Sequence, residues 1–307
     1  MENQSIAISK ILGYNCKIFK IKLNFWLKYF PSLSFYFSKY FTKELNFLQN
    51  VKFKYLITTG RRMAGYSILS KIIYNRKIIT IHLQNPKINP EKFDILIVPQ
   101  HDKISAKNII KTQGALSFFD LDDIKRSFKI TKIRPSTFDK PVTLLLIGGD
   151  NKRYKLSYSE YCRLLLKVRS AIQDISGSLF ISLSRRTPQK VYRIAKVIFS
   201  SYTKNFCLMD DSKNFYPGIL NITDYVIVTS DSINMISEIA STKINLFVYY
   251  FREEKNKIIE FNKLIENKRY AKKFTGRLYR YNKKCLNQNH FIKNQVMKMI
   301  EEKNLFK

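Results

Sequence analysis

The sequence is poor in three kinds of residue that often mark a binding site or a crosslink. Of its 307 residues, 9 are glycine, 4 are cysteine and 3 are histidine. The cysteines are isolated and form no CxxC pair, which argues against zinc-binding and disulfide frameworks and indicates a reduced compartment without a structural metal. No GxGxxG turn is present, which argues against an epimerase built on a dinucleotide-binding fold.

Long hydrophobic runs are absent as well. The most apolar region, 23–37, is interrupted by Lys28 and Pro31, so it predicts neither a signal peptide nor a spanning helix. We therefore expect a cytoplasmic protein, with peripheral attachment to the inner face of the cytoplasmic membrane as the alternative. The aromatic and basic stretch 25–50 would supply that attachment; the other interpretation is an ordinary helix with an aromatic core face.

Acidic residues are scarce relative to basic ones. The 55 Lys and Arg residues against 23 Asp and Glu residues give a formal charge of +32. Such a surplus is typical of proteins that contact nucleic acid or an anionic membrane. Here lysine accompanies abundant Ile, Asn, Phe and Tyr, the residues of A/T-rich codons, so compositional drift would give the same charge. No RNA-binding signature is present, and we expect no specific nucleic-acid partner.

Strand-like runs alternate with helical segments along the chain, which predicts an α/β fold with parallel sheets. The chain is long enough for two cores. We place the domain boundary in the charged, proline-containing segment 120–140. The predicted domains span 1–135 and 141–285, with a last helix in 286–307.

Polar residues follow three predicted strands of the first domain. Arg61, Gln84 and the pair His101-Asp102 each come directly after a β-rich run. Because the carboxyl ends of parallel strands meet at one edge of a sheet, these side chains and Asn108 are candidates for a cleft. His101 beside Asp102 is the best acid/base pair in the chain. Arg61 is equally consistent with a solvated helix start.

The stretch 221–250 predicts a strand, a polar turn, a helix and a second strand. Ser230, Asp231 and Ser232 form the turn, where free helical N–H groups attract an anion such as a phosphate. Glu238 follows about two helical turns later and would accept hydrogen bonds from ribose hydroxyls. The other interpretation is an ordinary helix cap followed by a solvated glutamate.

Two further turns of the second domain suit a diphosphate. Gly148 and Gly149 follow the apolar run 141–147, and glycine permits positive φ and a close approach of a ligand to the backbone. After the next strand, two hydroxyls and two guanidinium groups precede a helix, and these are Ser184, Arg185, Arg186 and Thr187. A capped helix with basic, solvent-facing residues would have the same pattern.

Together these motifs resemble the mitochondrial fission ELM family, named for elongated mitochondria in plants, with relatives in alphaproteobacteria. The resemblance covers nearly the whole chain. It rests on short motifs in a fixed order: Glu2-Asn3-Gln4, Gly60-Arg61-Arg62, Gln84-Asn85-Pro86, Pro99-Gln100-His101-Asp102, Thr112-Gln113-Gly114, Ile147-Gly148-Gly149, Ser184-Arg185-Arg186-Thr187-Pro188 and Thr229-Ser230-Asp231-Ser232.

The resemblance implies a GT-B-like fold of two Rossmann-like domains facing a cleft, an acceptor-side domain at 1–135 and a nucleotide-binding domain at 141–285. It implies a nucleotide-sugar-dependent glycosyltransferase that needs no metal and no other cofactor and acts on a lipid or cell-envelope acceptor, with His101 or Asp102 as the base. The segment 230–240 is similar to the donor loop of the N-acetylglucosaminyltransferase of peptidoglycan lipid precursor synthesis, whose matching acidic residue, here Glu238, holds the ribose.

Three further expectations follow from the resemblance. The last helix would pack back on the first domain. Relatives begin with a strand and a glycine loop, so we expect both to be missing from the N-terminal domain. The alternative to an enzyme is a non-catalytic peripheral-membrane or scaffold protein related to organelle or cell division, by analogy with the plant members.

Overall fold

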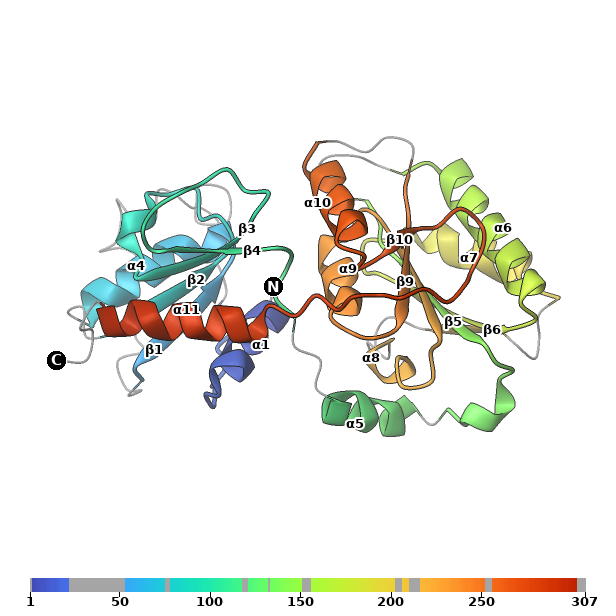
Figure 1. The fold of residues 1–307 in the computed structure, drawn as a ribbon, viewed down its shortest axis with the longest axis horizontal. Helices are drawn as coiled ribbons and strands as arrows, with labels where there is room; N and C mark the ends of the chain where they lie inside the picture. Colours follow the sequence, from blue (N-terminus) through green and yellow to red (C-terminus); the bar gives the residue numbers. More distant parts are fainter. Residues whose placement is uncertain are drawn as a thin grey trace. The chain divides into compact units, whose positions relative to one another are not determined.

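The computed structural model describes residues 2–21, 53–74, 78–117, 121–131, 133–150, 156–201, 206–209, 216–251 and 256–302. Two compact units emerge, one of Met1–Phe118 with Asn287–Lys307 and the other of Phe119–Leu286. Each unit contains a parallel sheet with helices on its faces, so the predicted α/β fold is confirmed (Figure 1). The aromatic stretch 25–50 lies outside the described residues.

The first unit has four parallel strands in the order β1-β2-β3-β4. Its helices and strands are α1 (Glu2–Leu12), β1 (Tyr55–Thr59), α4 (Ala64–Ile73), β2 (Ile79–Leu83), β3 (Ile95–Pro99), β4 (Ile109–Thr112) and α11 (Asn289–Glu302), with short 3₁₀ turns at Arg61–Met63 and Pro90–Lys92. The β-rich run 16–23 also predicts a strand, but its described part, residues 16–21, contains no strand.

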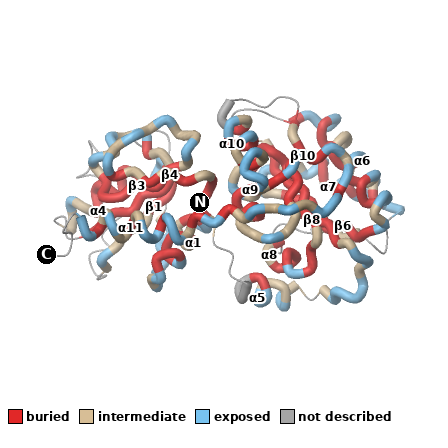
Figure 2. The backbone as a smooth tube through the Cα atoms, in the orientation of Figure 1, coloured by how far each residue is buried: buried red, intermediate tan, exposed pale blue. Residues whose placement is uncertain are grey.

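The last helix packs on the first unit because its apolar residues recur at helical spacing. Ile292, Val296 and Ile300 of α11 are buried against Ile8 of α1 and Ile81 of β2. α11 also contacts β4. Segments from the two ends of the described chain therefore share one core, as the buried stretches of α1 and α11 in Figure 2 show.

The second unit has six parallel strands in the order β10-β9-β8-β5-β6-β7. In chain order its elements are α5 (Leu121–Thr131), a 3₁₀ turn at Pro135–Thr137, β5 (Val142–Ile147), α6 (Tyr158–Asp174), β6 (Ser178–Leu183), α7 (Gln189–Ile198), β7 (Phe206–Met209), α8 (Tyr216–Ile219), β8 (Tyr225–Thr229), α9 (Ile233–Ala240), β9 (Asn245–Tyr249), α10 (Asn256–Asn267) and β10 (Lys272–Lys273).

β5 is buried on both faces, as expected from its continuous apolar run. Leu145 and Ile147 join the core under α6 and α7, while Leu144 and Leu146 join the core under α9 and α10. The chain runs from β5 outward to β7 on one side, then crosses to β8 on the other. This reversal creates a topological switch point between the carboxyl ends of β5 and β8, where ligands of open α/β sheets bind.

The segment 120–140 contains a helix of the second unit, whereas the sequence placed residues up to 135 in the first. α5 packs on α8, and Phe128 contacts the second core. This close packing requires a glycine on α8, because a Cβ at Gly218 would lie 2.7 Å from the backbone nitrogen of Phe128. The units divide at Phe118 and Phe119, before that helix.

A buried carboxylate fastens two strands of the first unit. Asp94 accepts hydrogen bonds from the Thr80 N–H and the Thr80 hydroxyl, both at 2.9 Å, and from the Lys71 ammonium at 2.5 Å. The side chain of Asp94 is only 5% exposed. Replacing it leaves these donors without their acceptor, and buried donors left unpaired are costly.

We predict that Asp94→Ala lowers the free energy of unfolding by about 3 kcal/mol. Urea unfolding followed by circular dichroism measures this loss. Asp174→Ala, at the exposed end of α6, is the control and should change stability by less than about 0.5 kcal/mol. Equal effects of the two substitutions would contradict this role of Asp94.

Candidate functional site

Three turns converge at the switch point of the second sheet. Gly148 and Gly149 follow β5, the turn Ser184 to Thr187 follows β6, and the turn Ser230 to Ser232 follows β8. The turns are fastened to one another because Ser184 donates its N–H to the Ile147 carbonyl at 2.9 Å. The structure thus brings together the predicted residues of all three turns.

Asp231 is the center of this arrangement. Its side chain is 0% exposed and accepts hydrogen bonds from the Gly149 N–H at 3.0 Å and the Thr229 hydroxyl at 2.7 Å. The Thr229 hydroxyl accepts the Gly148 N–H at 2.7 Å. Burial raises the pKa of Asp231, and the two hydrogen bonds and the charge of Arg186 oppose that rise. Asp231 therefore organizes the turns from inside.

The two glycines serve close packing between turns. A Cβ at Gly148 would lie 2.1 Å from an Asp231 carboxylate oxygen, and one at Gly149 would lie 2.3 Å from the Arg186 carbonyl. Neither glycine has positive φ. The close approach that the sequence indicated is thus made by the protein's own residues, and neither glycine uses the positive φ that its residue type permits.

The two neighboring arginines differ in their surroundings. Arg186 donates to Asp231 Oδ2 at 3.1 Å and to the Gly149 carbonyl at 3.3 Å, so its guanidinium bridges the turns after β5 and β8. Arg185 is exposed, and within the described part of the chain it has no hydrogen bond or ion pair. Arg186 is thus a structural clamp, while Arg185 keeps all its donors for a ligand.

The two hydroxyls of the β6 turn are also used internally. Thr187 donates to the Gly148 carbonyl at 2.5 Å, and its oxygen accepts the Ser184 N–H at 2.9 Å. Ser184 Oγ accepts the Arg186 N–H at 3.2 Å. These bonds shape the turn that precedes Pro188, the N-cap residue of α7.

The two serines of the β8 turn occupy different positions. Ser230 is fully buried, and its hydroxyl oxygen accepts the Phe251 N–H at 3.4 Å. Ser232 is the N-cap residue of α9, but its side chain makes no capping hydrogen bond. The first N–H groups of α9 therefore lack the usual side-chain cap at a position where an anion would be stabilized.

Glu238 is partly buried on α9, about two helical turns after Ser232. It accepts a hydrogen bond from the Tyr216 hydroxyl of α8. Burial raises the pKa of Glu238, and the Tyr216 hydrogen bond opposes this rise. The sequence did not indicate Tyr216, because its contact depends on how α8 packs beside α9.

Tyr161 is a second residue that the sequence did not indicate. Its ring packs edge-on against Phe251, with centroids 6.0 Å apart, and its buried hydroxyl has no hydrogen-bond partner among the described residues. Burial raises its pKa, with further contributions from the charges of Asp150 and Asp231. The Tyr161 hydroxyl is therefore close enough to the candidate site to be influenced by the charge of Asp231.

The predicted residues of the first unit lie on separate loops. His101 and Asp102 are half-buried beyond β3, and the Asp102 carbonyl accepts the Lys111 ammonium at 2.6 Å. Arg61 is exposed, and the Gln84 amide donates to Gln4 at 3.1 Å.

Asn108 has a structural role in the first unit. Its amide donates to the carbonyls of Pro90 and Phe93, both at 2.8 Å. It is 8% exposed and fixes the turn before β3 against β4. Both amide protons are used, so Asn108 can donate to a ligand only if these bonds break.

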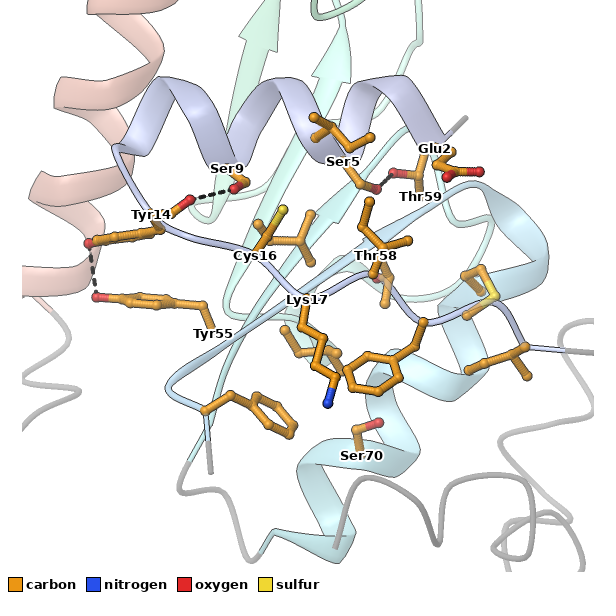
Figure 3. A pocket seen from close by; sticks show the side chains of 18 of the residues that line it. Glu2, Ser5, Ser9, Tyr14, Cys16, Lys17, Tyr55, Thr58, Thr59 and Ser70 are labelled. Carbon is orange, nitrogen blue, oxygen red and sulfur yellow. Dashed lines mark hydrogen bonds between the residues drawn. The ribbon is translucent and has the colours of Figure 1, made fainter. Parts of the chain in front are cut away.

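A cavity of about 820 Å³ lies elsewhere in the first unit. Figure 3 shows it between α1, the extended segment 14–21 and β1, with the Ser5–Thr59 and Tyr14–Tyr55 hydrogen bonds beside it. Of the described residues that line it, none was predicted for the site. Its walls are largely apolar, so it lacks the convergent polar groups of the switch point.

No helix among the described residues is long and apolar enough to cross a bilayer. No group of three or more His, Cys, Asp or Glu side chains among them is arranged to hold a metal ion.

Comparison with known proteins identifies the family. The profile of the mitochondrial fission ELM1 family matches residues 1–300. The chain belongs to this family. An uncharacterized Rickettsia prowazekii protein, RP120, is 30% identical, with 87% of this chain and 85% of that protein covered. The Arabidopsis thaliana mitochondrial fission protein ELM1 is 23% identical over 72% of this chain, which spans 57% of that protein.

The solved structures give the fold class of this ELM1-family chain. A structure of S. aureus MnaA with UDP matches with a TM-score of 0.50 at 12% identity, covering 99% of this chain and 86% of that one. Identity this low shows the fold alone. The predicted GT-B-like class, two Rossmann-like units, is confirmed.

The different surroundings of the two arginines predict different effects on stability. Arg186→Gln should lower the free energy of unfolding by about 2 kcal/mol, because buried Asp231 loses its only cationic partner among the described residues. Arg185→Gln is the matched control, and we expect a change below about 0.5 kcal/mol. Urea unfolding measures both. A larger loss from Arg185→Gln would contradict the assignment of Arg186 as the clamp.

The far end of α9 is held by Lys283. Its ammonium donates to the carbonyls of Ala240 at 3.1 Å, Ile239 at 3.4 Å and Thr242. These carbonyls belong to the last turn of the helix and to the residues that follow it, where a cation is favored. Burial lowers the pKa of Lys283 to about 8 from an ordinary value of 10.5.

This shift predicts a pH dependence of stability. Between about pH 8 and 10.5 the unfolded chain keeps a proton on Lys283 that the folded chain releases, so the contribution of this group to the free energy of unfolding rises with pH. We expect Lys283→Met to lack that rise. Urea unfolding of both proteins at pH 7.5 and 9.5 measures the difference, and parallel changes in the two would contradict the prediction.

Proposed function

We propose that this protein is a GT-B-type, nucleotide-sugar-dependent glycosyltransferase that acts on a lipid or cell-envelope acceptor without a metal ion. The donor diphosphate would bind at the switch point of the second sheet. The observation that carries the proposal is the convergence of the three turns around buried Asp231, beside the uncapped N-terminus of α9.

The chemistry of this edge suits a diphosphate. The first N–H groups of α9 and the positive end of its dipole stabilize anionic oxygens. Arg185 adds a planar guanidinium that can donate to two phosphate oxygens at once. In a transfer reaction the same groups would stabilize the negative charge that develops on the leaving diphosphate, which is the role a divalent cation has in other transferases.

Glu238 is our candidate for the donor ribose. Its carboxylate already accepts one hydrogen bond from Tyr216 and has further lone pairs for ribose hydroxyls. The raised pKa of Glu238 reflects its burial, and a hydroxyl-rich ligand would replace the lost water. Because S. aureus MnaA was solved with UDP, its shared fold supports a nucleoside diphosphate ligand.

For the acceptor half of the reaction we propose His101 or Asp102 as the base. Both lie beyond the carboxyl end of β3, and imidazole is the side chain that titrates near neutral pH. The Lys111 ammonium fixes the same loop through its hydrogen bond to the Asp102 carbonyl.

Nucleotide binding tests the proposal directly. We expect UDP, GDP or CDP to raise the melting temperature of the full chain in the presence of EDTA, because the site needs no metal. Arg185→Gln should weaken binding about tenfold, since one charge-assisted contact is worth about 1.5 kcal/mol or more. Arg277→Gln, also exposed in the second unit, is the control.

Calorimetric titration would give the affinities of these proteins. Absence of binding by every nucleoside diphosphate, in protein shown to be folded, would contradict the proposed function. It would favor the non-catalytic alternative.

A further inference from the structure

The outer faces of α6 and α7 form an apolar groove that no part of the proposed nucleotide site uses. Its volume is about 750 Å³. Its described lining is Cys162, Leu166, Gln189, Lys190, Arg193, Ile194, Val197 and Ile198. Val197 is 74% exposed and Leu166 is 53% exposed, and both border the same groove. These side chains form a continuous surface strip, in contrast to isolated exposed apolar residues, which are common.

The groove is bordered by cations and no anions. Lys190 and Arg193 line it, and Lys196 continues the basic stripe along α7. α7 contains no acidic residue, and no Asp or Glu is among the described residues of the lining. On α6, the nearby carboxylate of Glu160 is largely buried and pairs with Arg163 at 3.6 Å. The surface therefore combines exposed apolar groups with an uncompensated positive charge.

An aromatic side chain lies next to the cations. Tyr158, at the start of α6, is 44% exposed, and the Lys190 ammonium lies 4.6 Å from its ring centroid. Lys196 lies 4.8 Å from the ring of Tyr192 in the same way. Lysine with tyrosine beside an apolar strip is the combination that suits the lipid headgroup layer, where apolar, aromatic and cationic groups are all stabilized.

We propose that the α6–α7 face docks on an anionic lipid surface. Val197 and Leu166 would enter the headgroup layer while Lys190, Arg193 and Lys196 contact lipid phosphates. A lipid surface is favored over an acidic helix because Val197 and Leu166 are 74% and 53% exposed, so both are accessible to a broad surface and are not enclosed in the groove. The turn Ser184 to Thr187 leads directly into α7, so docking would bring the proposed nucleotide site to the membrane.

The inference is independent of nucleotide binding and is tested with the full chain. Vesicles of phosphatidylcholine with phosphatidylglycerol are compared with vesicles of phosphatidylcholine alone, by flotation at roughly physiological ionic strength. We expect at least tenfold stronger binding to the anionic vesicles. Equal binding to both kinds of vesicle, or to neither, would overturn the proposal.

Two sets of matched variants locate the docking face. The triple variant with Lys190→Gln, Arg193→Gln and Lys196→Gln should bind on the order of 100-fold more weakly, because each cation near an anionic surface contributes roughly a factor of five. The control has the same change of charge through Lys263→Gln, Lys268→Gln and Lys272→Gln, which are exposed elsewhere in the unit. Equal losses in the two triple variants would show attraction by overall charge and overturn the assignment of the face.

The apolar contribution has its own control. Val197→Asp and Leu166→Asp should each weaken binding about tenfold, whereas Ile72→Asp, at a residue 59% exposed on α4, should leave it unchanged. All three side chains are exposed, so the variants should keep the unfolding temperature of the parent. If Val197→Asp and Leu166→Asp both bind vesicles as strongly as the parent, the proposal is overturned, and a protein partner becomes the better candidate for the groove.

Discussion

The buried carboxylate of Asp231 is the constraint on which the candidate site depends. Burial of an unpaired charge is unfavorable, so the surrounding groups must satisfy it. Gly149 does so from the turn after β5, Arg186 from the turn after β6 and Thr229 from the end of β8. The need to solvate one anion thus fixes the spacing of the turns, and the glycines are required because nothing larger fits between them.

In this arrangement, the residues that hold the turns together differ from the residues that would bind a ligand. Arg186 and Thr187 donate hydrogen bonds to Asp231 and to the Gly148 carbonyl. The guanidinium of Arg185 and the first N–H groups of α9 therefore stay available for a ligand. The helix itself is held at its other end by Lys283. A site on a helix that is fixed at both ends binds with little loss of conformational freedom, and preorganized donors stabilize developing charge most effectively.

The sequence predicted the sheet of the second unit well because its strands are buried on both faces. Continuous apolar runs such as that of β5 have few alternatives to a central parallel strand. The strand expected at 16–23 has the same β-rich composition, but in the described residues it lacks a pairing partner. Strand formation depends on neighbors in the sheet, which a local pattern does not contain.

The sequence predicted which turns form the site, but it did not predict the hydrogen bonds that connect them. Residue type showed that Arg185 and Arg186 could meet an anion, yet only the fold distinguishes them, because the direction of each side chain depends on the turn between β6 and α7. Tyr161 and Tyr216 were missed since tyrosines on helices are usually core residues. Likewise, α5 was placed in the wrong unit because its contact with Gly218 is distant in sequence.

The central claim is that the three turns act as one anion-binding unit. Hydrogen–deuterium exchange of the full chain, with and without a saturating nucleoside diphosphate, tests it most directly. The account predicts that amides at 148–150, 184–188 and 230–235 gain protection together, while the loops of the first unit change less. Protection confined to one turn, or absent from all three, would contradict it.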